Sequence, residues 1–184
     1  MFQEGLGRLF DLSPFVAPVD INTADTATGL RISMTGHTGI AIVLYTLVGG
    51  ADTITVDVQQ HTAYTGGTSA DLDATAVATS SGIDHYYIKA ETALDGDESW
   101  VKVSQTAASE VTIDGATYGA QQKLVCIQVG ADQLGDGYTH LSAIVSLTTS
   151  TSQLLAGLYI PYDLNVQRTP TNRPNLLRPG AANA

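Results

Sequence analysis

The stretch from Gly39 to Gln60 decides the fold and reads GIAIVLYTLVGGADTITVDVQQ. Its first arm, residues 39–48, is an apolar run rich in β-branched residues and shorter than the ~20 residues of a membrane helix, so it predicts a strand covered on both faces. The second arm, residues 53–60, alternates apolar and polar residues and predicts a strand with one buried face. The Gly49-Gly50 link predicts a hairpin between the arms. Together they predict a sheet that packs against a second sheet.

Further strand patterns follow one another along the chain, separated by turn signals and without a long helical pattern. They cover residues 30–34, 85–91, 99–106, 110–113, 123–129, 138–147 and 154–162. Eight or nine strands with several long connections favour a jelly roll over an immunoglobulin-like sandwich. The predicted fold class is therefore all-β: an antiparallel β-sandwich, jelly-roll-like, with extended N- and C-terminal arms.

The predicted boundaries are an N-terminal arm (1–19), the sandwich domain (20–162) and a C-terminal arm (163–184). The N-terminal arm could form one amphipathic helical turn closed by Pro14, and either packs on its own domain or docks on a neighbour. The C-terminal arm contains Pro170, Pro174 and Pro179 and predicts an extended, polyproline-like segment, either disordered or ordered only in an assembly. Residues 61–82, rich in Thr, Ala, Ser and Gly, predict a surface loop, either partly ordered or mobile.

Charge is low and unevenly divided. Only 14% of the 184 residues are charged, and the net charge of −10 argues against nucleic-acid binding through phosphate neutralisation. Arg168, Arg173 and Arg178 lie in the C-terminal arm, where no carboxylate follows Asp163. A basic arm on an acidic body predicts attraction to an acidic surface such as a neighbouring copy.

The single cysteine rules out an internal disulfide, and its apolar neighbours predict that Cys126 is an inert core thiol. The chain opens without a signal-peptide pattern and contains no apolar run long enough for a membrane helix. We therefore expect no membrane partner.

The sequence lacks the nucleophile-elbow, zincin, P-loop and dinucleotide-binding motifs. Its four histidines are scattered singly and are expected at the surface or rim rather than on a metal. The acidic groups Asp71-Leu72-Asp73 and Asp95-Gly96-Asp97-Glu98 depart from the EF-hand pattern, and turn chemistry explains them, although a loop-bound cation stays a minor alternative. We therefore expect no enzyme activity and no cofactor.

The order of segments carries a resemblance. Residues 20–25 (DINTAD) open the domain and precede the strand at 39–45, DTITVDVQQ at 52–60, HYYIK at 85–89, WVKVSQT at 100–106 and IQVGADQL at 127–134. Over residues 20–162 this order resembles a group of small structural proteins of tailed bacteriophages, encoded among head genes, that act as minor capsid or decoration proteins.

The resemblance implies a virion protein on the capsid exterior, assembled in the host bacterial cytoplasm, that binds the major capsid protein and reinforces the shell. The loop at 61–82 and the C-terminal arm do not match it. An extra apolar face on the strand at 40–48 suits self-association in a cyclic oligomer, and a homotrimer is the preferred arrangement.

The residues expected to bind partners lie in the two arms and on the apolar strand. They are Phe2, Leu6, Phe10, Val43, Tyr45, Leu47, Arg168, Arg173, Leu176, Leu177 and Arg178. The alternative function is a receptor- or glycan-binding module of a phage tail or fibre. In that case sugars would stack on Tyr64, Tyr86, Tyr87, Trp100 and Tyr138, although these aromatics are more simply explained as core and strand-face residues.

Overall fold

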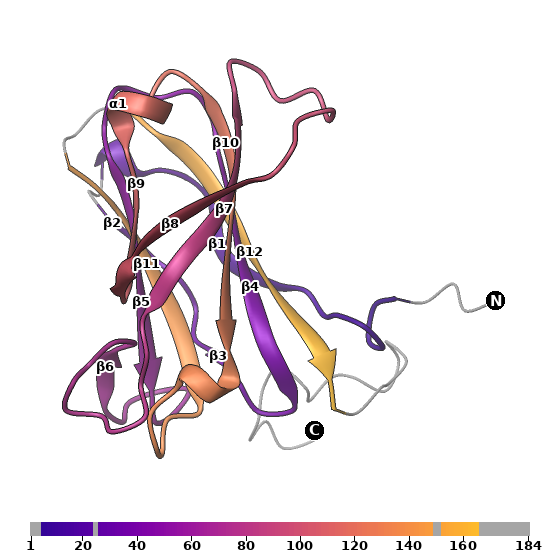
Figure 1. Ribbon diagram of the computed structural model, residues 1–184, viewed down its shortest axis with the longest axis vertical. Helices are drawn as coiled ribbons and strands as arrows, with labels where there is room; N and C mark the ends of the chain where they lie inside the picture. Colours follow the sequence, from indigo (N-terminus) through magenta and orange to yellow (C-terminus); the bar gives the residue numbers. More distant parts are fainter. Residues whose placement is uncertain (1–4, 24–25, 149–151, 166–184) are drawn as a thin grey trace.

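A computed structural model describes residues 5–23, 26–148 and 152–165, and these residues form two antiparallel sheets packed face to face (Figure 1). Sheet A contains, in spatial order, β1 (Ser13–Asp20), β12 (Leu154–Leu164), β4 (His37–Thr46), β10 (Gln122–Gly130), β7 (Ile83–Glu91) and β8 (Val101–Ala108). Sheet B contains β2 (Thr26–Thr28), β11 (His140–Leu147), β5 (Ile54–His61) and β6 (Ser69–Asp71), with β3 (Ile32–Ser33) beside β11 and β9 (Glu110–Ile113) beside β5. The described helical segments are short: η1 (Ile21–Thr23), α1 (Gly115–Tyr118) and η2 (Ala131–Gln133).

The strand order is that of a jelly roll. Sheet A begins β1-β12-β4-β10, and the facing strands of sheet B are β2-β11-β5-β9. The chain therefore crosses from one sheet to the other at most of its connections, as in a double Greek key. The segment between β5 and β9 adds β6 to sheet B and the β7–β8 pair to the far edge of sheet A. The predicted all-β sandwich of jelly-roll type is confirmed.

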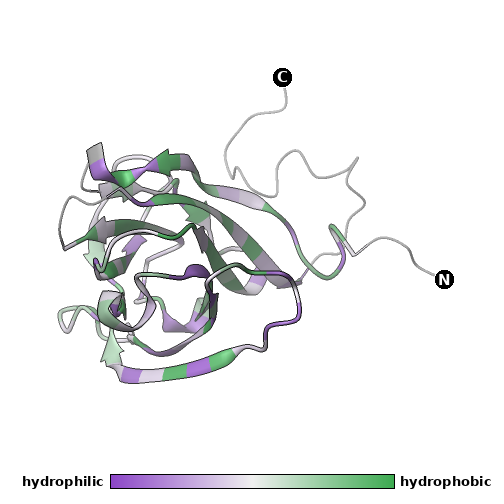
Figure 2. Cartoon of the chain, turned by 90° about the horizontal axis from the view of Figure 1, so that it is seen from above, coloured by the Kyte–Doolittle hydropathy of each residue, from purple (hydrophilic) through white to green (hydrophobic). Residues whose placement is uncertain are grey.

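The core lies between the sheets and follows the period of two along each strand (Figure 2). In β5, Ile54, Val56 and Val58 are fully buried, while the residues between them are half-buried. The ring of Phe15 from β1 packs on that of Tyr159 from β12, with centroids 5.1 Å apart. The Tyr159 hydroxyl accepts a hydrogen bond from the backbone N–H of Ala143 in sheet B, which ties the two sheets together at 3.1 Å.

The predicted hairpin between residues 39–48 and 53–60 is wrong. β4 pairs with β12 and β10 in sheet A, whereas β5 pairs with β11, β9 and β6 in sheet B. Residues 47–53 form the link that crosses between the sheets. Two apolar strands joined by a short glycine-containing link look alike in sequence whether they form a hairpin within one sheet or cross between two sheets. Only the pairing with the remaining strands decides between these two arrangements.

The predicted boundaries also need correction. Residues 13–19, assigned to an N-terminal arm, belong to β1 at the edge of sheet A, where Phe15 is buried in the core. β12 continues to Leu164, two residues beyond the predicted end of the domain. The predicted loop at 61–82 contains β6, which pairs with the end of β5. The C-terminal arm from residue 166 onwards lies outside the described residues.

Two predictions about single side chains are wrong. Cys126 is half-buried on the outside of sheet A rather than in the core, because Val125 and Ile127 take the inward positions of β10. His37, His61 and His140 are buried rather than placed at the surface. Short patterns around single polar residues do not show which loops will fold over them.

Candidate functional site: the outer face of sheet A

The outward positions of β4 are apolar. Ile42 and Leu44 point into the core and are fully buried, so Val43 and Tyr45 point away from it. Tyr45 is 38% exposed, and Leu47, just after the strand, is 36% exposed. The apolar run thus supplies residues to the core and to the outer surface of sheet A. The outward residues Val43 and Tyr45 are only partly shielded from solvent.

The neighbouring strands extend this surface because their registers align apolar residues with those of β4. On β12, Ala156 lies opposite Tyr45 and Leu158 lies opposite Val43. On β10, Leu124 lies opposite Tyr45 and Cys126 opposite Val43. We call these residues and their neighbours the outer apolar face: Val43, Tyr45, Leu47, Leu124, Cys126, Leu154, Ala156, Leu158 and Ile160.

Several of these side chains are too exposed to be covered by any described element. Leu154 is 48% exposed and Leu158 is 46% exposed, values unusual for leucines grouped on adjacent strands. Contiguous exposed apolar surface of this kind marks interaction sites in soluble proteins. The outer apolar face is therefore the strongest candidate for a binding surface among the described residues.

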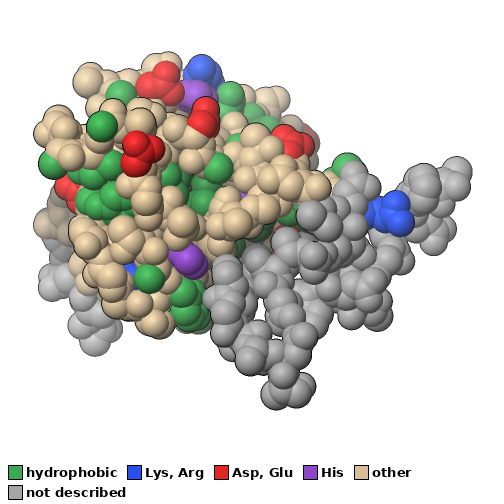
Figure 3. Space-filling view, turned by 90° about the horizontal axis from the view of Figure 1, so that it is seen from below, with side chains coloured by type: hydrophobic (Ala, Val, Ile, Leu, Met, Phe, Trp, Pro, Cys, Tyr) green, Lys and Arg blue, Asp and Glu red, His purple; other side chains and the backbone are tan. Residues whose placement is uncertain are grey.

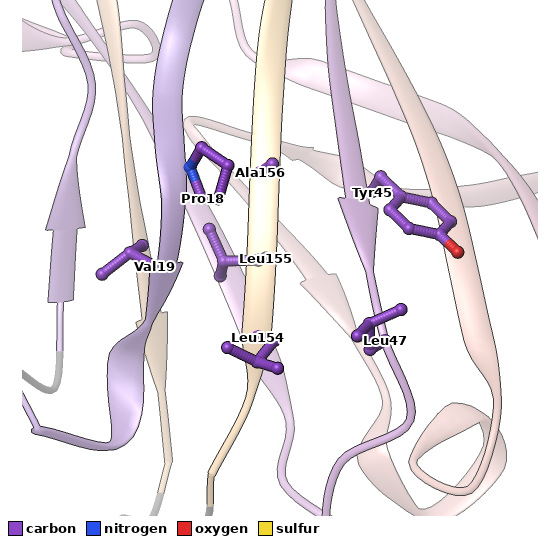
Figure 4. A pocket seen from close by; sticks show the side chains of 7 residues that line it. All are labelled: Pro18, Val19, Tyr45, Leu47, Leu154, Leu155 and Ala156. Atoms are coloured by element: carbon purple, nitrogen blue, oxygen red, sulfur yellow. The ribbon is translucent and has the colours of Figure 1, made fainter.

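A groove of about 300 Å³ lies at the end of the outer apolar face where β12 begins (Figure 4). It runs between β1 and β4, with the start of β12 along its floor, and is lined by Pro18, Val19, Tyr45, Leu47, Leu154, Leu155 and Ala156. The hydroxyl of Tyr45 donates a 3.1 Å hydrogen bond to the side-chain oxygen of Gln122 on β10, which fixes the ring. The groove offers apolar surface with almost no hydrogen-bonding groups, so it suits an aliphatic side chain.

The outer face of sheet B has the opposite character. Its rows contain Thr55 opposite Thr112, and Asp57 opposite Glu110. Gln59 donates from its side-chain nitrogen to a carboxylate oxygen of Asp57 at 2.7 Å and of Asp71 at 2.6 Å. Burial, reinforced by the neighbouring carboxylates, raises the pKa of Asp57. One side of the sandwich is thus apolar, and the other carries hydroxyls and carboxylates.

The structure brings together only part of the predicted partner-binding set. Val43, Tyr45 and Leu47 share the outer apolar face. Leu6 and Phe10 lie beside the end of β12, where Phe10 pairs with Tyr162. Phe2, Arg168, Arg173, Leu176, Leu177 and Arg178 lie outside the described residues. Sequence reasoning missed Leu154, Leu158 and Pro18, although the alternation of residues 154–160 is the signal that could have identified the two leucines.

A second polar cluster lies at the far end of sheet B. The His61 ring hydrogen-bonds through Nδ1 to Ser69 at 2.7 Å and through Nε2 to Ser142 at 2.8 Å. Arg31 donates to the Ser69 hydroxyl and to the carbonyl oxygens of Ala63 and Gly66. Burial lowers the pKa of His61 to about 4, which makes it a weak general base near neutral pH. The hydrogen bonds of this cluster therefore hold the loop after β5 in place, and the cluster is poorly suited to act as a catalytic nucleophile with its general base.

The acidic turn at residues 95–98 brings its three carboxylates within 4.8 Å of one another. The Glu98 carboxylate accepts backbone N–H bonds from Asp95 and Gly96. The cluster therefore closes its own turn in the way that turn chemistry predicts.

The aromatic residues considered for sugar binding do not form one platform. Tyr86 is buried in the core, and Tyr138 is partly buried against the core. Tyr64 lies beside His140, whereas Trp100 stacks under the Lys89 ammonium, 5.3 Å from its ring centroid.

Comparison with protein families, characterised proteins and solved structures finds no match for this chain. Among the described residues, no helix is both long and apolar enough to cross a membrane.

Proposed function

We propose that this protein is a structural assembly component that docks onto another protein surface through the outer apolar face of sheet A. The observation that carries the proposal is the contrast between the two faces. Tyr45, Leu154 and Leu158 expose apolar surface on one side, whereas the other presents Thr55, Thr112 and carboxylates. Covering the apolar side contributes about 25 cal/mol per Å² of apolar surface removed from water, and the polar side then stays in solvent.

We further propose that the assembly is the head of a tailed bacteriophage and that the chain is a capsid decoration, or cement, protein. The support is the resemblance in segment order over residues 20–162 together with the docking face. A rigid sandwich that spans contacts between major capsid subunits adds buried area where a pressurised shell would rupture. We propose a homotrimer over a threefold position of the shell. Its three outer apolar faces would multiply the contacts with the major capsid subunits and supply avidity.

The test is the binding of purified protein to phage heads that lack it. We expect wild-type protein to sediment with the heads and to raise the temperature at which a dye gains access to the packaged DNA. The double substitution Tyr45→Asp with Leu158→Asp places two charges on the outer apolar face and should reduce the bound fraction at least tenfold.

The matched control is Thr28→Asp with Thr112→Asp, which adds the same charge to two exposed positions of sheet B. This variant should bind like the wild type, and both variants should keep the far-ultraviolet spectrum of a β protein. Equal binding by both pairs would exclude the outer apolar face as the docking surface. Wild-type protein that neither binds nor stabilises the heads would refute the decoration role.

A further inference from the structure

The chain leaves the described structure at a fixed point next to the outer apolar face. Leu164 pairs with His37 at the start of β4, and the backbone N–H of Asn165 donates to the carbonyl oxygen of Gly36 at 2.9 Å. Residues 166–184 therefore begin at one end of β4, and the groove lined by Tyr45 and Leu47 lies at the other end.

The length of this C-terminal segment matches the distance to the groove. The 10 residues of β4 rise about 3.3 Å each, which places Leu47 about 33 Å from the start of the strand. Pro170 and Pro174 favour a polyproline conformation, which rises about 3.1 Å per residue and carries the chain about 34 Å between Asn165 and Leu176. Leu176 and Leu177, which are adjacent, can thus reach the groove of the same chain.

The chemistry of the segment also matches. Leu176 and Leu177 are its only leucines, and the groove offers about 300 Å³ lined by apolar side chains. Arg178 follows directly, and the Asp20 carboxylate lies at the same end of sheet A, as the register partner of the groove residue Leu154. Hydrogen bonds from the Ser152 hydroxyl and the Asn22 backbone N–H lower the pKa of Asp20, which keeps it ionised.

The overall charge distribution favours the same contact. The body is acidic beyond the surroundings of the groove, because carboxylates are also visible at the opposite end of the molecule, seen from below (Figure 3). The segment after Asn165 carries three arginines and no carboxylate, within a chain of net charge −10. Attraction between the segment and the body adds to the apolar match.

We propose that the groove of the outer apolar face binds Leu176-Leu177 of the same chain, with Arg178 facing Asp20. Tethering favours this occupant, because a short linker holds the segment at a millimolar effective concentration. This inference rests on the proposed function in that it takes the same face as the docking surface.

The test is a paramagnetic relaxation measurement on the full-length chain. Glu91 lies beside Gln122 on the outside of sheet A, two strand spacings, or about 10 Å, from β4. A nitroxide at Glu91→Cys, in a Cys126→Ser background, should remove more than half of the amide signal intensity of Leu176 and Leu177. A nitroxide at Thr112→Cys in the same background, on sheet B, should leave these signals unchanged.

Two further samples decide the assignment. Replacement of both leucines by serine should restore the intensity at positions 176 and 177, and because both lie outside the sandwich the fold is not at risk. A mixture of isotope-labelled protein without nitroxide and unlabelled protein with nitroxide should show no loss. Loss in that mixture would assign the groove to a second copy and overturn the same-chain contact, and no loss in any sample would overturn the proposal altogether.

These measurements use the free protein, so their failure is distinguishable from failure of the docking proposal. A chain without the leucine contact could still bind phage heads through Tyr45 and Leu158. Conversely, a chain that fails to bind heads could still hold its C-terminal segment in the groove.

Discussion

Phe15 shows how closely single residues are fitted in this sandwich. Its ring packs between Gly29, just after β2, and Gly157 on β12, and a Cβ atom at either glycine would overlap the ring. The glycines are required here because of close approach, not because of an unusual backbone angle. Phe15 therefore anchors β1 to the core through a complementary shape on both sheets.

We predict that Gly157→Ala lowers the free energy of unfolding by about 1–3 kcal/mol, because the new methyl group would meet the Phe15 ring and, at 3.0 Å, the carbonyl oxygen of Val43. Urea titration measures the loss. Phe15→Leu removes part of the ring, so the two substitutions together should destabilise by less than the sum of their single effects. Strict additivity would show that the clash lies elsewhere.

Lys123 is a buried cation on the inward side of β10, only 1% exposed. Its ammonium donates to the carbonyl oxygens of Tyr118 and Gln121, both at 2.9 Å, and desolvation lowers its pKa. We predict that Lys123→Met, which preserves most of the volume, costs about 1–3 kcal/mol because two carbonyls lose their donor. Lys102→Met, on an exposed position of β8, is the control and should change the free energy of unfolding by less than about 0.5 kcal/mol.

At the scale of elements, the strands were predictable but their partners were not. Alternation and apolar runs identify β5, β7 and β10 within one or two residues, because side-chain period depends only on local sequence. Strand pairing depends on the topology of the whole chain. The local sequence therefore predicts a hairpin of β4 and β5, although these strands lie in different sheets. β1 was missed because Pro14 and Pro18 suggest an irregular arm, yet an edge strand tolerates proline.

The link between β4 and β5 is clamped rather than loose. Gly49 donates its backbone N–H to the Gly119 carbonyl oxygen at 3.3 Å, and the Thr53 hydroxyl accepts from the Gly115 N–H at 3.2 Å. Insertion of Gly-Ser-Gly after Gly50 should therefore cost more than about 2 kcal/mol, since several hydrogen bonds must break.

The same insertion after Gly96, at the open turn between β7 and β8, is the matched control. Gly96 has a φ of +104°, and a Cβ atom at this position would have no neighbour within 4 Å. Lengthening this turn gives up only the solvent-exposed hydrogen bonds from Asp95 and Gly96 to Glu98 and otherwise adds loop-closure entropy, so it should cost less than about 1 kcal/mol. Thermal unfolding of both proteins gives the comparison. Equal losses would mean that the link between the sheets is not a structural constraint.

At the scale of the whole molecule, three of the nine residues of the outer apolar face could be predicted from the sequence. The apolar run from Ile40 to Val48 has more apolar residues than one buried face can use, which pointed to Val43, Tyr45 and Leu47. The contributions of Pro18, Leu154 and Leu158 could not be predicted, because they depend on β1 and β12 lying beside β4. A surface that spans three strands is a property of register and cannot be read from any one segment.

Buried histidines give the whole molecule a dependence on pH. Burial lowers the pKa of both His37 and His61 to about 4, and lowers that of His140 as well. In the unfolded chain these rings bind protons near the ordinary value of about 6.5. The unfolded state therefore holds more protons than the folded state between about pH 6.5 and 4, and stability is lost as the pH falls through this window.

We predict that the free energy of unfolding is constant above about pH 7 and falls by roughly 1–2 kcal/mol per buried ring by pH 5, following the linkage relation for a lowered histidine pKa. Urea titrations at pH 7, 6 and 5 measure the slope, and proton NMR of the imidazole Cε1–H signals shows directly whether the rings of His37 and His61 stay neutral at pH 5. The carboxylates with lowered pKa, such as Asp20, protonate only at lower pH. Asp57, whose pKa is raised, binds its proton more readily in the folded state and therefore reduces the net slope. A flat stability between pH 7 and 5, or titration of these rings near pH 6.5, would mean that the segments over them open readily. The end of the sandwich where β4 starts and β5 finishes would then be less tightly closed than the burial of these rings indicates.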